Sequence, residues 1–275
     1  MSGVSGAWMS GDVSAMAGNE AGQRDEVAEA GQVLAGDEAA QRDEVAEAGR
    51  VLAGLGLVTA FGHVSARAGS AMLITPAADL GEVTADRVVR TRLDADALPA
   101  GAPAEAWAHL ALYRRRADVE AIARAQPPSA FAAAAAVGPG DGAGGPGGIE
   151  PLYGQAAWLG ERVPVHDDAR LLRSMALAEA AAARLPDGEA LLLRGNGAIT
   201  LGAAPGLAVA RMWLLAAACQ AFLAARAAGP VTPLSPAEIA SWRAVSGELL
   251  PRLWHHLRRR PRGQRHGYDD AGETG

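Results

Sequence analysis

One short segment of the chain carries a carboxylate, an imidazole, a guanidinium and an amide, on Glu105, His109, Arg124 and Gln126. Glu105 and His109 lie four residues apart, a spacing that places both side chains on one face of a helix. A carboxylate can move a proton, and a guanidinium can hold a carboxylate or an enolate through parallel hydrogen bonds. This segment is therefore the first candidate for an active site.

A helix followed by a strand has to position these side chains. The apolar side of residues 107–112 predicts a helix that begins near Glu105, and residues 119–123 predict a short buried strand. Residues 124–126 end this strand, because Pro127 and Pro128 cannot donate hydrogen bonds to a sheet. The four polar side chains should therefore lie at the two ends of one helix–strand unit.

The composition excludes several kinds of chemistry. All 25 residues counted as Lys or Arg are arginine, so a Schiff base on a lysine, a pyridoxal phosphate anchored in the usual way and a Walker phosphate loop are excluded. A single cysteine, Cys219, excludes internal disulfides and sites with several cysteine ligands. We expect no cofactor.

The charge and the hydropathy pattern limit the partners. The net charge of −6 gives the chain no general affinity for nucleic acid or an anionic membrane. No apolar run was expected to approach the ~20 residues that span a bilayer, and the first residues lack the pattern of a secretion signal. The sequence thus predicts a cytoplasmic protein with no nucleic acid or membrane partner.

A repeat and changes in composition divide the chain. Residues 23–36 recur almost unchanged as residues 41–54. The predicted organisation is a disordered lead at residues 1–22, a duplicated helical extension at 23–40, a folded domain at 41–250 and a basic, partly disordered tail at 251–275.

Short strands alternate with helices along the domain, which predicts an α/β fold with a mixed or antiparallel sheet. Asp168 is the expected cap of one helix, and Ser235 with Glu238 forms a capping box for another. Residues 207–228 form a long apolar helix that must be buried, in the core or between subunits. The further expected elements are hairpins at 61–67 with 71–79 and at 189–194 with 198–201, and strands within 83–93 and 159–165.

Blocks of sequence in a fixed order resemble the class II aldolase/adducin family, from about Glu44 to Ala228. Residues 47–67 are similar to the opening helix and glycine turn of that family, and residues 71–79 are similar to its threonine–proline strand. Residues 105–123 are similar to its glutamate helix with the following strand, and residues 191–202 to its late hairpin. The resemblance implies a three-layer α/β/α fold with a central, mostly antiparallel sheet. It also implies a homo-oligomer, often a tetramer, with sites between subunits.

The resemblance also implies a site whose metal ligands are missing here. Members of the family hold a divalent cation with three histidines, and a glutamate that matches Glu105 moves the proton. At the ligand positions this chain has Arg124, Gln126 and Asn196. Because arginine has no lone pair to donate and carries a fixed positive charge, we expect no metal. The phosphate subsite of the family is altered as well, with His63 in its glycine turn.

The resemblance gives each candidate residue a role beside a plainer one. Glu105 and Arg124 are the candidate catalytic residues, with the guanidinium in place of the metal; Arg124 could instead be a structural ion-pair partner. His63, Gln126, Asn196 and Tyr113 are the candidate substrate-binding residues. The alternative for His63 is a strand residue that is satisfied locally, the alternative for Gln126 and Asn196 is a role in turns, and the alternative for Tyr113 is a place in the core. His109 is expected to fix the helix or a subunit contact.

The hypothesis is a metal-independent lyase that acts on a small, anionic, carboxylate-bearing metabolite by retro-aldol cleavage, decarboxylation or dehydration. These reactions share the need to stabilise negative charge next to a carbonyl group. A non-catalytic binding or scaffold protein and an isomerase or epimerase are the alternatives. An enzyme should bring Glu105, Arg124 and Asn196 around one concave cavity, whereas a scaffold can let that cavity fill in. The sequence does not identify the substrate.

Overall fold

The computed structural model describes residues 36–137 and 147–259 of the 275-residue chain. The chain divides into two units, residues 1–40 and 41–275. In the first unit the described residues, 36–40, are helical. The predicted lead at 1–22 and most of the predicted extension at 23–40 lie outside the described residues, so the remaining description concerns the second unit.

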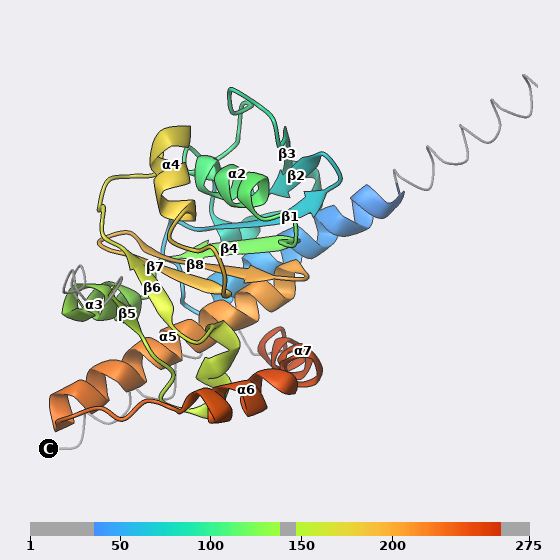
Figure 1. Ribbon diagram of the computed structural model, residues 1–275. Helices are drawn as coiled ribbons and strands as arrows, with labels where there is room; N and C mark the ends of the chain where they lie inside the picture. The colour runs from blue at the N-terminus through green and yellow to red at the C-terminus, as the bar shows by residue number, and fades with distance from the viewer. Residues whose placement is uncertain (1–35, 138–146, 260–275) are drawn as a thin grey trace, which may run out of the picture. The chain divides into compact units, whose positions relative to one another are not determined.

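A mostly antiparallel sheet forms the centre of the second unit (Figure 1). Its strand order is β3-β2-β1-β4-β8-β7-β6-β5, and β6 and β7 are the only neighbours among the described strands that run parallel. The strands are β1 (His63–Ala68), β2 (Ala71–Ile74), β3 (Val89–Arg92), β4 (Ala121–Ala125), β5 (Gly148–Ile149), β6 (Val163–His166), β7 (Ala190–Leu193) and β8 (Gly197–Gly202).

Helices cover both faces of the sheet. Leu191 and Leu193 of β7 pack in the cluster of α2 (Ala106–Arg115) and α4 (Met175–Ala182). Ala190 and Leu192 point the other way, into the cluster of α3 (Pro128–Val137), α5 (Pro205–Ala228) and the helical residues 41–54. This alternation is the period of a strand buried on both faces. The structure thus confirms the predicted three-layer α/β/α fold (Figure 1).

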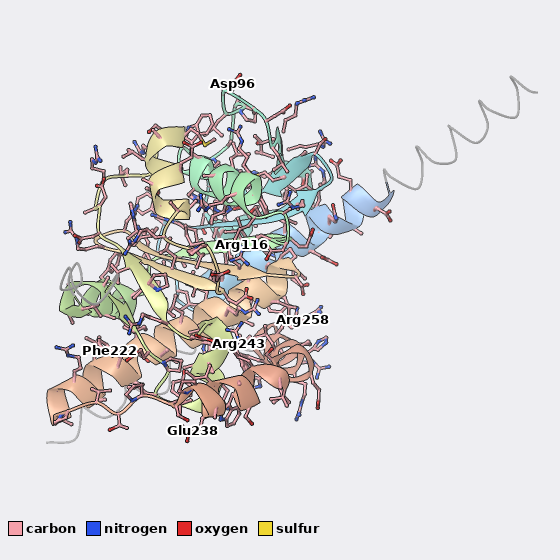
Figure 2. The ribbon with its side chains drawn as sticks, in the orientation of Figure 1. Asp96, Arg116, Phe222, Glu238, Arg243 and Arg258 are labelled. Carbon is pink, nitrogen blue, oxygen red and sulfur yellow. The ribbon has the colours of Figure 1, made fainter. Side chains whose placement is uncertain are left out.

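The helical residues 41–54 are held to the sheet by both apolar and charged contacts. Val45 and Leu52 are fully buried, and Arg42 donates to the carbonyl oxygen of Val88 over 2.6 Å. Glu47 forms an ion pair of 2.9 Å with Arg258, which is labelled in Figure 2. The helical stretch ends at residue 54, close to Gly56, whose φ of 69° favours glycine.

The helix α5 corrects the expectation that the chain has no apolar run of membrane-spanning length. Its most apolar window has a mean hydropathy of 1.7, and its length and composition would allow it to cross a membrane. However, 56% of that window is buried inside the protein. Arg211 on α5 donates to the carbonyl oxygen of Leu201 over 2.8 Å and lies 3.3 Å from a carboxylate oxygen of Glu189. These contacts are those of a core helix.

The start of α4 differs from the prediction. The helix begins at Met175, and Ser174 caps it by accepting a hydrogen bond from the backbone nitrogen of Leu177. Asp168, the expected cap, instead accepts hydrogen bonds from the backbone and side chain of Arg170. This local turn competes with helix formation and keeps the chain out of a helix up to Ser174. The capping box of Ser235 and Glu238 is confirmed.

Two C-terminal helices cover this side of the protein: α7 (Ser246–Leu257) packs on α5, and α6 (Pro236–Ala244) packs on the 3-10 helix η3 (Gly154–Leu159). Two other short 3-10 helices, η1 (Leu80–Glu82) and η2 (Ala85–Arg87), precede β3. Leu257 is 1% exposed. The packed part of the chain therefore continues past the boundary expected at residue 250, and residues 260–275 of the predicted tail lie outside the described residues.

Glycines accept the tryptophans of these two helices. A Cβ atom on Gly206 of α5 would overlap the indole ring of Trp254, and one on Gly154 would overlap that of Trp242. The indole nitrogen of Trp158 also donates to the backbone oxygen of Trp242 over 2.8 Å. Since each ring lies directly against backbone, the helices have little room to shift.

We predict that Gly206→Ala lowers the free energy of unfolding by about 1–3 kcal/mol, because the new methyl group forces Trp254 out of its place. Gly247→Ala is the matched control, since nothing lies within 4 Å of that position in α7, and it should be neutral or stabilise by about 0.5 kcal/mol. Urea unfolding measures both. Equal stabilities for Gly206→Ala and the unmutated protein would contradict the packing of α7 on α5.

Candidate active site

The ends of three neighbouring strands bring distant parts of the chain together. The strand β4 runs antiparallel to both β1 and β8, so the start of β1, the end of β4 and the β7–β8 turn lie at the same end of the sheet. His63 of β1 is the direct cross-strand partner of Arg124, and Asn196 lies in the turn just before β8. Cross-strand partners point to the same face of a sheet.

Two glycines allow the backbone to close around the end of β4. A Cβ atom on Gly197 would overlap the carbonyl oxygen of Ala125, and the φ of Gly197 is 95°. A Cβ atom on Gly62 would lie 3.1 Å from the carbonyl oxygen of Arg124 and would overlap Val58. Only glycine meets both demands at position 197, so the turn holds Asn196 against β4.

Arg124, Glu105 and Asn196 form a closed network of hydrogen bonds. The guanidinium nitrogen Nη2 of Arg124 lies 3.0 Å from Glu105 Oε2 and donates to both the backbone oxygen and Oδ1 of Asn196. Asn196 Nδ2 donates to Glu105 Oε1 over 2.9 Å, and the backbone nitrogen of Leu172 donates to the same oxygen over 3.4 Å. The side chain of Arg124 is 2% exposed and that of Glu105 is 13% exposed. Both oxygens of the carboxylate are thus fixed in place.

Glu105 occupies the cap position at the start of α2 but makes no capping hydrogen bond to that helix. Its carboxylate reaches the sheet instead, and the extended residues before α4 contribute Leu172. The cap residue of α2, the last residues of β4 and the β7–β8 turn are therefore joined through one carboxylate.

A second buried group of polar side chains lies beneath α2. The Ser65 hydroxyl is 2.7 Å from His109 Nδ1 and 2.8 Å from the Tyr113 hydroxyl. The rings of His63 and His109 have centroids 5.8 Å apart. Because Ser65 follows His63 by two residues on β1, it points to the same face of the sheet as His63 and Arg124.

Three nitrogen atoms of these two groups are buried without a hydrogen-bond partner among the described residues. They are His63 Nδ1, His109 Nε2 and Arg124 Nη1. A buried donor without a partner costs about 1–3 kcal/mol, so such atoms are normally satisfied by a ligand or by ordered water.

Burial sets the charge of this region. It lowers the pKa of His109 to about 3, and the charge of Arg124 adds to this effect. Burial, followed by His109 and Arg124, holds the pKa of His63 well below its ordinary value. Burial also lowers the pKa of Arg124, against the opposing effect of Glu105, but an arginine stays protonated. Both imidazoles are therefore neutral at neutral pH.

The structure brings together four of the six predicted site residues: Glu105, Arg124, Asn196 and His63. Tyr113 is in the core and contacts this group only through Ser65. Gln126 is half-buried at the same end of the sheet, and its backbone nitrogen donates to the carbonyl oxygen of Leu57 over 3.1 Å. The catalytic and binding roles of all six stay predictions.

Ser65 was not among the predicted site residues, and His109, although part of the candidate segment, was expected to fix the helix or a subunit contact. The signal was present in the spacing, because Glu105, His109 and Tyr113 recur every four residues along one face of α2. On β1, His63 and Ser65 alternate onto the face that α2 covers. Only the pairing of β1 with β4 brings these two patterns together.

The sequence model of the family described as Class II Aldolase and Adducin N-terminal domain matches residues 43–223. The chain belongs to this family. No curated protein matches it closely enough to be informative.

Solved structures of class II aldolases resemble the chain. YgbL of Escherichia coli, a putative aldolase/epimerase/decarboxylase, is 23% identical, with a TM-score of 0.63 over 75% of this chain and 99% of that one. An L-fuculose 1-phosphate aldolase from Glaciozyma antarctica is 20% identical, with a TM-score of 0.65 over 82% of this chain and 90% of that one. The L-fuculose-1-phosphate aldolase of Thermus thermophilus is 27% identical, with a TM-score of 0.59 over 68% of this chain and 96% of that one.

The residues at the expected metal position of this class II aldolase family member do not fit a divalent cation. Arg124 brings a fixed positive charge and no lone pair, and Asn196 is already bonded to Glu105 and Arg124. Within residues 36–137 and 147–259, no group of three or more His, Cys, Asp or Glu side chains could hold a metal. The donor set fits an anion.

We predict that His109 makes the protein less stable as pH falls. Its pKa is 6.5 when unfolded and about 3 when folded, so below pH 6.5 the unfolded chain binds the proton more readily. Stability is complete above pH 6.5 and should fall by about 1.4 kcal/mol per pH unit for this group, down to the folded pKa.

Urea unfolding between about pH 7 and about pH 5 compares the unmutated protein with His109→Gln, which should lose about 2 kcal/mol less across that range. His255→Gln, at an exposed position of α7, is the control and should follow the unmutated protein. Parallel curves for all three proteins would show that His109 is not kept neutral by its burial.

Proposed function

We propose that this class II aldolase family member is a metal-independent lyase that acts on a small carboxylate-bearing metabolite. The observation that carries the proposal is the state of the buried Arg124 guanidinium. Its Nη2 is fixed by Glu105 and Asn196, while its Nη1 has no partner among the described residues. A preorganised cation with an unused donor can stabilise negative charge that develops on a substrate oxygen.

In a retro-aldol reaction, Glu105 would accept the proton of the substrate's β-hydroxyl group. The bond between the α and β carbons breaks, a carbonyl group forms on the β carbon, and the electron pair moves into an enolate. The positive charge of Arg124 stabilises this enolate. Glu105 then returns its proton to the α carbon. Decarboxylation and dehydration pass through the same kind of enolate, with carbon dioxide or water as the leaving molecule.

The hydrogen bonds of Glu105 suit this role. Oε2 contacts Arg124, and Oε1 accepts from Asn196 and Leu172, so the carboxylate cannot rotate. An ionised carboxylate has about four lone-pair sites, and three donors leave one of them for a substrate hydroxyl. Positioning of this kind lowers the entropy cost of the reaction.

The proposed enzyme is a cytoplasmic homo-oligomer, a tetramer by family resemblance, with its sites at subunit interfaces. Two exposed apolar residues beside the network support this arrangement. Phe61 is 65% exposed two residues before His63, and Leu171 is 46% exposed next to Leu172. A second copy of the chain would cover both side chains and would complete the wall of the site.

A non-catalytic binding or scaffold protein is the second candidate. It is favoured by the mutual satisfaction of Glu105, Arg124 and Asn196, which is also what a structural ion pair requires. A cavity of about 780 Å³ lies elsewhere, between η3, α5 and α7. An isomerase or epimerase would use the same enolate and differs only in where the proton returns.

Replacement of Arg124 separates these candidates. Arg124→Met should lower turnover of small 3-hydroxy and 3-oxo acids by about 10²-fold or more, because the developing anion loses its preorganised cation. Arg211→Met is the matched control. It removes another largely buried arginine that is paired with a glutamate, and it should keep turnover while it loses a similar amount of stability.

The scaffold candidate predicts a different result. In that case the unmutated protein turns over none of the small 3-hydroxy and 3-oxo acids, so neither variant changes turnover. Both variants only melt at a lower temperature.

Metal content provides an independent prediction. Elemental analysis of the purified protein should find far less than one transition metal per chain, and a chelator should leave turnover unchanged. The triple variant Arg124→His, Gln126→His and Asn196→His should gain zinc, because these positions then offer imidazole nitrogens at one end of the sheet. The proposal is contradicted if the unmutated protein holds about one zinc per chain and loses its activity when a chelator removes that zinc.

A further inference from the structure

A buried chain of hydrogen bonds fixes the position of the proton on His109. The chain runs from the Tyr113 hydroxyl to Ser65 and then to His109 Nδ1, over 2.8 and 2.7 Å. Burial raises the pKa of Tyr113, so its hydroxyl keeps its proton. His109 is neutral, so only one of its two ring nitrogens carries hydrogen.

Three arrangements of the protons fit these distances. In the first, Tyr113 donates to Ser65, Ser65 donates to His109 Nδ1, and His109 carries its hydrogen on Nε2. In the second, His109 Nδ1 donates to Ser65, and Ser65 donates to Tyr113. In the third, Tyr113 and His109 Nδ1 both donate to Ser65, whose own hydrogen then serves neither bond. The second leaves the Tyr113 hydrogen and the lone pair of His109 Nε2 without partners here, and the third leaves the Ser65 hydrogen and the same lone pair, whereas the first leaves only one N–H group. Because unsatisfied buried groups are costly, the first arrangement is favoured.

The N–H group of His109 then lies near other buried nitrogen atoms that lack a partner among the described residues. His109 Nε2, His63 Nδ1 and Arg124 Nη1 all lack a partner among the described residues, and their side chains are 0%, 7% and 2% exposed. The two rings are neighbours, with centroids 5.8 Å apart, and the charge of Arg124 acts on both. Glu105, the carboxylate of this network, is held by the other guanidinium nitrogen.

We infer that His109 Nε2 and Arg124 Nη1 together bind the carboxylate group of the substrate. We call this pair of donors the carboxylate seat. Ser65 and Tyr113 are positioning residues, since they hold the proton on the nitrogen that faces the ligand. The inference deepens the proposed function and rests on it for the identity of the ligand as a substrate.

The donors also indicate the class of substrate. One guanidinium and one neutral imidazole match the two oxygens and the single charge of a carboxylate. A phosphate monoester carries about two charges and three terminal oxygens, and this seat would leave part of that charge unpaired. The seat therefore favours small carboxylic acids over sugar phosphates.

Two measurements test the seat on the intact protein. Nitrogen-15 NMR of the histidine rings should find the hydrogen of His109 on Nε2, and Tyr113→Phe should shift it towards Nδ1, because Ser65 loses its donor. Titration calorimetry with oxalate, a planar dicarboxylate that resembles an enolised 2-oxo acid, should detect binding. His109→Gln and Tyr113→Phe should each weaken it about tenfold, the effect of one lost hydrogen bond.

His166→Gln is the matched control. His166 is also buried with an unpartnered Nε2, but the charges that act on it are those of Asp168, Arg184, Asp167 and Arg170. This variant should bind oxalate as the unmutated protein does.

The inference is overturned if the hydrogen is found on Nδ1, if the unmutated protein does not bind oxalate, or if His109→Gln and Tyr113→Phe bind it with unchanged affinity. The last result would mean that only a buried water satisfies the three nitrogens.

These results are separable from the lyase proposal. Oxalate binding with the expected losses, but no turnover of any acid, supports the seat and contradicts the lyase. Turnover with a KM unchanged by His109→Gln supports the lyase and contradicts the seat.

Discussion

The buried positive charge of Arg124 is the constraint on which this end of the molecule depends. Removing a charged group from water costs several kcal/mol, and only close, hydrogen-bonded partners offset that cost. Glu105 and Asn196 supply those partners at one nitrogen of the guanidinium. To reach it, the cap residue of α2 must lie over the end of β4, and the β7–β8 turn must close against the same strand. Loss of one partner would leave the other charge buried and unpaired, so three elements depend on one ion pair.

This polar network is confined to one layer of the fold. Between α2 and the sheet, the strand positions that would otherwise be apolar carry His63, Ser65 and Arg124. Their neighbours on the opposite face, Val64, Ala123 and Ala125, belong to the apolar cluster beneath α5. The fold can tolerate buried polar groups on one side because the other side is packed with alanine, leucine and valine. A rigid sheet then holds the polar atoms in fixed positions, which a site that stabilises developing charge requires.

Local patterns in the sequence predicted most of the elements and an α/β fold, whereas the three layers were implied by the family resemblance. Alternating apolar residues marked the hairpins, Gly195 and Gly197 marked a turn, and Ser235 marked a helix start. The failures had two causes. Asp168 was expected to cap a helix, but a competing local turn occupies its carboxylate with Arg170. The other cause was contacts between distant residues. The candidate residues could be named from motifs, yet the bonds among Glu105, Arg124 and Asn196, and the link from Ser65 to His109, depend on strand pairing that no local pattern encodes.

A guanidinium in the place of a metal changes which reactions this fold can support. A divalent cation accepts lone pairs, so it can polarise a carbonyl oxygen directly and can lower the pKa of a bound water. A guanidinium carries a single charge, accepts nothing and only donates hydrogen bonds. It can therefore stabilise a carboxylate or an enolate oxygen, but it cannot generate hydroxide from water. Arg124 itself therefore suits reactions that develop charge on an oxygen beside the breaking bond. In the proposed lyase, Glu105 is the base and Arg124 stabilises the charge, and the ion pair joins the two groups. The fixed distance between them would then restrict the substrate to a short chain of atoms between the proton to be removed and the oxygen that receives the charge.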